Sequence, residues 1–219
     1  MKRAFSCLIV FVLFSAVALA QSDPPKVVLI GDSIRIGYAP IVKKKLEGKA
    51  IIVSAEQNGA DSKNVLSNLD DWVIREKPAI VHFNCGLHDL KFDKVKKTHQ
   101  VPIDDYEKNL RKIVDRIRKE STAVLIFATT TPIHDERHSK RKANFDRLEA
   151  DVQKYNAVAE KVMKEVQVPV NDLHAVVIKG VMEKLLSGDG THYTKPGYET
   201  LADVVVAAIK PHLMAVKGK

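Results

Sequence analysis

The chain has 219 residues, of which 45% are hydrophobic and 28% are charged, a balance typical of a globular domain rather than a disordered or fibrous chain. This length suits one domain whose hydrophobic core needs no disulfide or metal to stabilise it. The formal net charge of +8 could attract anionic partners. However, the basic residues are spread along the chain without interleaved aromatic residues or a nucleic-acid motif, so we expect no nucleic-acid binding.

The first twenty residues have the composition of a secretory signal peptide. A basic start is followed by an apolar run, and Ala18 and Ala20 place small residues at the two positions that signal peptidase reads. We therefore predict cleavage before Gln21, a mature domain over residues 21–219, and a secreted or periplasmic protein without stable membrane association. The alternative is an uncleaved membrane anchor, because the apolar run is almost long enough to span a bilayer.

Apolar runs that are typical of buried strands alternate with helical patterns along the rest of the chain. The predicted strands are 26–30, 50–53, 79–83, 122–127 and 168–170. The predicted helices cover about 38–46, 65–73, 106–117, 142–166, 176–186 and 195–216. This alternation predicts an α/β fold, a three-layer α/β/α sandwich around a roughly five-stranded, flavodoxin-like parallel sheet.

Four polar segments follow predicted strands or precede the final helix. They are Gly31-Asp32-Ser33, Asn58-Gly59, the segment from Asn84 to Asp89, and the segment from Asp189 to His192. The carboxyl ends of parallel strands converge on one crevice, so these segments can meet there. Together they supply a nucleophile, a base, an acid and backbone amides, which are the parts needed for acyl transfer. Each motif alone has an ordinary alternative, since Gly-Asp-Ser and Asp-x-x-His also occur as helix caps.

The order and placement of these segments resemble the SGNH (GDSL-like) hydrolase family over essentially the whole predicted mature chain. The resemblance implies that Ser33 is the nucleophile and that Asp189 and His192 complete a catalytic triad. It also implies that the amides of Ser33 and Gly59 bind the oxyanion, and that no metal or organic cofactor is required. The G-x-S-x-G pattern of α/β-hydrolases is absent, because Arg35 stands where its second glycine would be.

One sequence block departs from the family pattern. The family's third block is usually G-x-N-D, whose asparagine donates to the oxyanion, whereas this chain has histidine at position 88 in the segment Gly86–Asp89. An imidazole N–H can also donate, so we hypothesise that His88 is the third oxyanion donor. Alternatively, His88 only packs in its loop and catalysis is weakened. The side-chain amide of Asn84, in the same loop two residues before Gly86, is a weaker candidate for contact with substrate.

His134 and His138 lie four residues apart, but the metalloprotease motif needs glutamate directly after the first histidine and Asp135 stands there. We therefore predict no metal site and expect this segment, after a strand, to form a loop along the pocket wall, where His134 can contact substrate. The basic residues around Lys91 and in segment 137–142 could attract an acidic polysaccharide, although a solvated surface is the favoured explanation for them.

The expected function is an exported serine esterase that removes short acyl groups, above all O-acetyl groups, from carbohydrates or small molecules. Three alternatives stay open: a weakly active or inactive carbohydrate-binding protein of the same fold, a lysophospholipase or thioesterase, and an acyltransferase. The sequence does not indicate an oligomeric state.

Overall fold

The structure, a computed structural model, describes residues 23–217. The predicted signal peptide lies outside these residues, so its cleavage stays a prediction. The elements in chain order are β1 (Lys26–Ile30), α1 (Ser33–Lys45), β2 (Ile51–Ser54), α2 (Ser62–Ser67), a π-helical turn (Asp70–Ile74), β3 (Ile80–Phe83), β4 (Phe92–Asp93), β5 (Thr98–His99), α3 (Ile103–Glu120), β6 (Val124–Ala128), α4 (Asp135–Ser139), β7 (Phe145–Asp146), α5 (Glu149–Glu165), β8 (Val170–Asn171), α6 (Leu173–Lys179), α7 (Met182–Leu185) and α8 (Lys195–Lys217).

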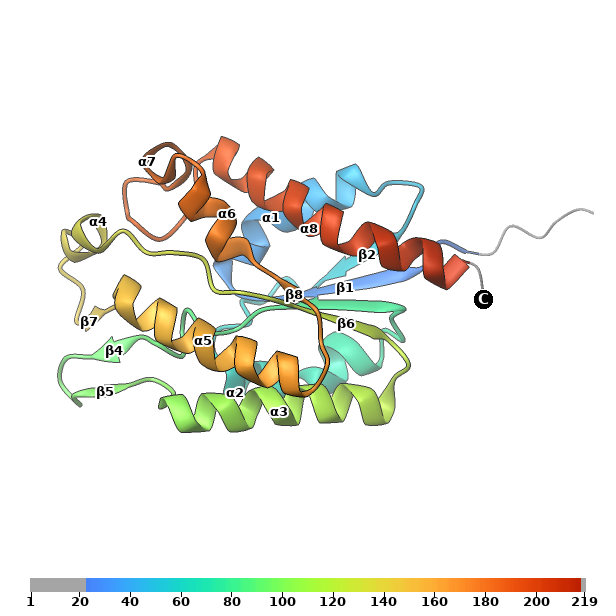
Figure 1. Ribbon diagram of the computed structural model, residues 1–219, viewed down its shortest axis with the longest axis horizontal. Helices are drawn as coiled ribbons and strands as arrows, with labels where there is room; N and C mark the ends of the chain where they lie inside the picture. Colours follow the sequence, from blue (N-terminus) through green and yellow to red (C-terminus); the bar gives the residue numbers. More distant parts are fainter. Residues whose placement is uncertain (1–22, 218–219) are drawn as a thin grey trace, which may run out of the picture.

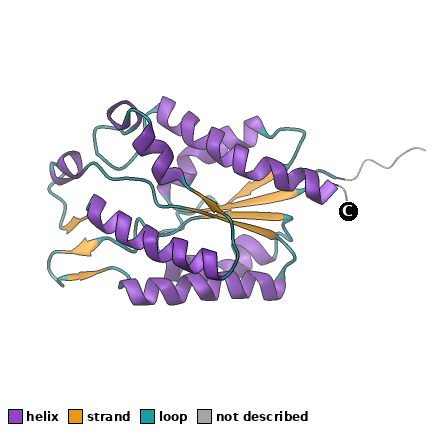
Figure 2. Ribbon diagram, viewed as in Figure 1, coloured by secondary structure: helices purple, strands orange, loops and turns teal. Residues whose placement is uncertain are grey.

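Five parallel strands form the central sheet in the order β2-β1-β3-β6-β8. Counted within the sheet, this is the 2-1-3-4-5 order of flavodoxin-like folds, so the predicted fold class is confirmed. Helices α1, α6, α7 and α8 cover one face, and α2, α3 and α5 cover the other (Figures 1 and 2). Among the described residues, no helix combines the length and apolarity needed to cross a membrane.

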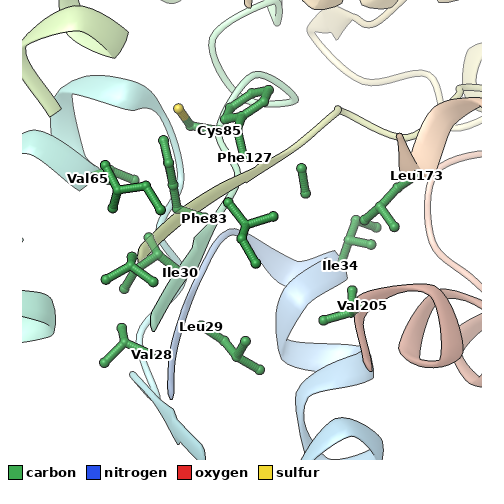
Figure 3. Close-up of a cluster of buried hydrophobic side chains, with 14 of the residues drawn as sticks. Val28, Leu29, Ile30, Ile34, Val65, Phe83, Cys85, Phe127, Leu173 and Val205 are labelled. Atoms are coloured by element: carbon green, nitrogen blue, oxygen red, sulfur yellow. The ribbon is translucent and has the colours of Figure 1, made fainter. Parts of the chain in front are cut away.

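The core lies on both faces of β1 and β3, whose buried residues are apolar apart from His82, as burial on both sides favours. Alternate residues of β1 point to opposite faces. Leu29 lies on the side of Ile34 and of Val205 from α8, whereas Ile30 lies on the side of Val65 from α2 (Figure 3). This packing fixes the two helices relative to the carboxyl ends of the strands, where the candidate site lies.

Several predicted helices have different bounds in the structure, among them the one over 65–73, which is divided between α2 and the π-helical turn. The first predicted helix begins at Ser33 rather than near residue 38. Gly37 and Pro40 lower the local helix propensity, but capping by Asp32 and burial of the apolar helix face outweigh that effect. The predicted helix over 142–166 begins only at Glu149, and the predicted helix over 176–186 is divided between α6 and α7.

A second sheet was not predicted. Strands β5, β4 and β7 pair antiparallel in that order, and each has only two residues. This small sheet lies beyond the carboxyl ends of the parallel strands (Figure 1). It therefore brings residues 91–99 and 145–147 to the same end of the molecule as the predicted site.

Candidate active site

The nucleophile candidate lies at the turn between β1 and α1. Strand β1 ends at Ile30, and the Asp32 side chain caps the helix by accepting a 2.8 Å hydrogen bond from the amide of Ile34. Ser33 is thus the first helical residue, and the amides around it are free of intrahelical partners. The positive end of the helix dipole also favours negative charge here. The turn lies between β1 and β3, where the strand order of the sheet reverses and ligands usually bind in open α/β folds.

Ser33, His192 and Asp189 form a continuous chain of hydrogen bonds. The Oγ of Ser33 lies 2.9 Å from Nε2 of His192, and Nδ1 of the same ring lies 2.6 Å from Oδ2 of Asp189. The serine and the histidine are 159 positions apart in sequence. The structure therefore brings together all three residues predicted for a triad, in the geometry that lets the ring accept the serine proton while the carboxylate orients it.

The carboxylate of Asp189 is held in its ionised form by its neighbours. Burial raises its pKa, but hydrogen bonds from the His192 ring, the amides of His192 and Thr191, and the Ser187 hydroxyl outweigh burial and leave the pKa well below its ordinary value. Arg141 adds a positive charge 3.7 Å from Oδ2. An ionised Asp189 can stabilise the imidazolium that forms when His192 takes a proton.

The Gly59 amide, predicted to bind the oxyanion, has a backbone partner in the structure, and its role in catalysis stays a prediction. This amide donates to the carbonyl oxygen of Gly31 at 2.9 Å, and a Cβ on Gly59 would lie only 2.7 Å from the same oxygen. Close backbone approach therefore requires glycine at this position. The next amide, that of Ala60, donates at 2.8 Å to the exposed side chain of Asn58, which a substrate oxygen can displace. Together with the Ser33 amide, it is the better backbone donor.

His88 is held in place through its neighbour Asp89. The buried carboxylate of Asp89 accepts from the amide of Ser62 at 3.0 and 3.1 Å and from its hydroxyl at 2.5 Å. Asn109 donates in turn to the same hydroxyl at 2.9 Å. This network ties the loop after β3 to the start of α2 and so fixes the backbone that carries His88.

The environment of His88 favours a neutral ring. Burial lowers its pKa most, the negative charge of Asp32 raises it, and the positive charges of Arg147 and Lys91 lower it further. The net effect is a lowered pKa, so the imidazole is neutral at neutral pH. A neutral imidazole still carries one N–H and can act as a hydrogen-bond donor.

The two weaker candidates have other partners. Asn84 donates from Nδ2 to the carbonyl oxygen of Ala128 at 2.8 Å, which joins the ends of β3 and β6. His134 caps the short helix α4, where the prediction was a loop, and its ring accepts from the Arg137 amide at 3.4 Å. The His134 amide donates to Gly190 at 2.9 Å, so this residue lies against the loop that carries the catalytic acid and base. A contact of either residue with substrate stays a prediction.

His134 and His138 do not lie in a cluster of potential metal ligands in the part of the chain that the structure describes. Nδ1 of His138 lies 3.1 Å from the hydroxyl oxygen of Thr191. Within residues 23–217, no three histidine, cysteine or acidic side chains gather closely enough to hold a metal ion.

Sequence reasoning missed Arg147, a charged residue near the site that is only 7% exposed. Residues 142–148 were assigned to a long polar helix, in which an arginine would lie at the surface. Instead they include strand β7, whose pairing with β4 carries the chain back toward the active site. Periodicity gave no signal against the helix, because Leu148 and Val152 follow Phe145 at helical spacing.

The comparisons with known proteins agree with this geometry. The sequence profile of the GDSL-like lipase/acylhydrolase family matches residues 29–200. Among solved structures, a lipase/acylhydrolase from Enterococcus faecalis is 25% identical, with a TM-score of 0.73 over 85% of this chain and 96% of that chain. No functionally curated protein matches the sequence significantly.

Two esterases share the fold at lower identity. The acetyl xylan esterase AlAXEase is 20% identical, with a TM-score of 0.69 over 84% of this chain and 99% of its own. A catalytic mutant of an acetylxylan esterase from Geobacillus stearothermophilus is also 20% identical, with a TM-score of 0.69 over 84% of this chain and 94% of its own. These similarities extend over nearly the whole described domain.

Proposed function

We propose that this chain, which belongs to the GDSL-like lipase/acylhydrolase family, is a serine ester hydrolase that uses Ser33, His192 and Asp189 as its catalytic triad. The observation that carries the proposal is the hydrogen-bond chain from the Ser33 hydroxyl through His192 to Asp189, with distances of 2.9 and 2.6 Å. A helix cap alone does not explain a serine and a histidine meeting from opposite ends of the domain.

The first half of the reaction forms an acyl-enzyme. The Ser33 oxygen adds to the ester carbonyl carbon while its proton passes to Nε2 of His192. The tetrahedral intermediate then collapses, and His192 returns the proton to the departing alcohol oxygen. Asp189 keeps the ring in the tautomer whose Nε2 can accept and stabilises the transient imidazolium.

The second half restores the enzyme with water. His192 accepts a proton from the attacking water as the hydroxyl oxygen adds to the acyl carbon. Collapse of the second intermediate releases the carboxylic acid and returns the proton to Ser33. In both halves the negative oxygen is bound by the amides of Ser33 and Ala60 and by the ring N–H of His88. Such preorganised donors often make the largest single contribution to catalysis.

The substrate that we propose is a short-chain ester, above all an O-acetyl group on a carbohydrate. The fold similarity to two acetylxylan esterases supports this choice. The side chains of His192 and Asp189 are 36% and 30% exposed. A site this open suits a bulky alcohol such as a sugar chain. Together with the predicted signal peptide, these features support an enzyme acting outside the cytoplasm.

Replacement of the nucleophile tests the proposal. We expect Ser33→Ala to lower kcat/KM on 4-nitrophenyl acetate by at least about 10³-fold, because no other group replaces the attacking oxygen. Ser67→Ala, on an exposed position of α2, is the matched control and should leave the rate unchanged. A panel with longer acyl chains separates an acetylesterase from a lipase. A folded parent protein without activity on any ester would contradict the proposal and favour a binding protein.

A further inference from the structure

Within the described residues, Arg147 is a buried cation without a hydrogen-bond or ion-pair partner. Its Nε makes no hydrogen bond, and no carboxylate of the described residues lies within ion-pair distance of its guanidinium. The adjacent Asp146 is paired instead with Lys94 at 2.7 Å. Burying a charge without compensation destabilises a fold, so such a residue is rarely kept for stability alone.

An aromatic ring and a second cation complete its surroundings. The guanidinium carbon lies 5.1 Å from the centre of the Phe145 ring, and Nζ of Lys91 lies 4.7 Å from the same centre. The pairing of β4 with β7 holds Phe145 opposite Asp93, close along the chain to Lys91. The ring therefore positions two positive charges together, and cation–π attraction stabilises both.

This pair of cations adjoins the catalytic residues. The charges of Arg147 and Lys91 both lower the pKa of His88, and the charges of Asp32 and Asp189 act in turn on Arg147. Burial is the main cause of the lowered pKa of Arg147, because no carboxylate of the described residues forms an ion pair that would offset it. The Phe145 ring that contacts Arg147 also lies 5.8 Å, centre to centre, from the ring of His138, and Nδ1 of His138 lies 3.1 Å from the hydroxyl oxygen of Thr191, the residue before His192. An anionic group on a substrate bound at the triad would therefore supply the missing partner of the guanidinium.

We propose that Arg147, assisted by Lys91, binds an anionic substituent of the sugar that bears the ester, so that the natural substrates are acidic acylated carbohydrates. The planar fork of an arginine can bind a carboxylate or a sulfate oxygen pair through two parallel hydrogen bonds. The inference rests on the proposed ester hydrolysis but concerns which alcohol is selected. It differs from general attraction by surface lysines, because it assigns selectivity to one buried side chain.

The test compares one charge-removing variant on neutral and acidic esters. Arg147→Met should lower kcat/KM by about 10- to 100-fold on acetylated oligogalacturonate, because a hydrogen-bonded charge is lost. It should change the rate on neutral acetylated xylo-oligosaccharide by less than about threefold, in line with the size of a lost peripheral contact. An acetylated, sulfated oligosaccharide in a third arm distinguishes sulfate from carboxylate. Arg147→Lys should keep part of the preference.

Two controls distinguish a loss of substrate selectivity from a general effect of removing a positive charge and from a loss of folding. Arg116→Met removes the same charge from an arginine that is 35% exposed and paired with Asp70 and Glu120, so it should not alter the preference. The thermal midpoint of Arg147→Met should stay well above the assay temperature, because loss of the cation–π contact is offset by removal of a buried unpaired charge. An equal loss of rate on neutral and acidic esters by the folded variant would overturn the proposal.

Binding without turnover keeps this inference distinct from the proposed function. Titration of Ser33→Ala protein with acetylated oligogalacturonate should give a dissociation constant at least about 10-fold lower than titration of the Ser33→Ala/Arg147→Met double variant, by the same hydrogen-bond argument. If the parent hydrolyses no ester but this difference is found, the esterase proposal fails and the anion site stands. If hydrolysis depends on Ser33 and the two dissociation constants are equal, the anion site fails alone.

Discussion

Two of the proposed catalytic side chains, those of Ser33 and His88, are positioned by neighbours that take no part in the chemistry. Asp32 caps the helix that presents Ser33, and Asp89 anchors the loop that presents His88. The sequence motifs therefore contain two kinds of residue, and only the structure distinguishes them. Gly59 illustrates the difference, because its place in the motif predicts an oxyanion donor, whereas its contacts in the structure show that it allows β1 and the loop after β2 to approach closely.

His88 provides the sharpest test at the residue scale. We expect His88→Ala to lower kcat by about 10²–10³-fold with little change in KM, because an oxyanion donor acts mainly in the transition state. His88→Asn restores a donor of the family type and should retain kcat within a few-fold. Steady-state kinetics on 4-nitrophenyl acetate measure both effects. If both variants match the parent enzyme, His88 is not a donor.

The backbone at Ala60 gives a second prediction. This residue has φ of 50°, a left-handed conformation that destabilises residues with a Cβ. Ala60→Gly should therefore raise the free energy of unfolding by about 1 kcal/mol while keeping the amide and hence the activity. Urea denaturation measures the stability change, and a loss of stability would show that the methyl group has a packing role.

At the scale of elements, the sequence predicts those helices and strands whose apolar residues recur with a regular period or form a buried run. Strands β1, β3 and β6 of the main sheet were identifiable because their runs of residues are buried between two layers of helices. The strands of the small sheet have two residues each, which is too few for an alternation of apolar and polar residues to be recognised in the sequence. Arg147 was missed at the site because β7 was not predicted, and β7 is the strand that brings Arg147 to the catalytic end of the molecule.

The contact between α1 and α8 depends on one small residue. A Cβ on Gly37 would lie 2.1 Å from the Tyr198 ring, so Gly37→Ala must push the two helices apart. We expect a loss of about 1–3 kcal/mol in the free energy of unfolding, the usual effect of overpacking. Gly188→Ala is the control, since its added Cβ would meet no atom within 4 Å. Equal stability of the two variants would show that α8 adjusts freely.

At the scale of the whole molecule, buried titratable groups make stability depend on pH. Burial raises the pKa of Asp89 to about 7, against the opposing effect of its hydrogen bonds from Ser62. The folded protein therefore binds this proton more tightly than the unfolded chain does. The stability that Asp89 contributes is complete below pH 4 and is lost as the pH rises toward 7. Buried His82, whose pKa is lowered to about 4, acts in the opposite direction between pH 4 and 6.5.

Comparison with an uncharged variant isolates the Asp89 contribution. Asp89→Asn should remove a decline of on the order of 3–4 kcal/mol in unfolding free energy between pH 4 and pH 7. The contribution of His82 cancels because both proteins carry it. Urea denaturation of the two proteins across this pH range gives the difference. If the two pH profiles are parallel, the Asp89 pKa is not shifted in the folded state.

The 159 positions between Ser33 and His192 make the active site a reporter of complete folding. A fluorophosphonate dye reacts only with a serine whose proton can be removed, so labelling requires the first and last elements of the sheet domain to have docked. A chain arrested, cleaved or misassembled anywhere between these residues would stay unlabelled even if most of its helices had formed. Gel fluorescence after a labelling pulse would thus count native molecules directly, during refolding or in a cell extract.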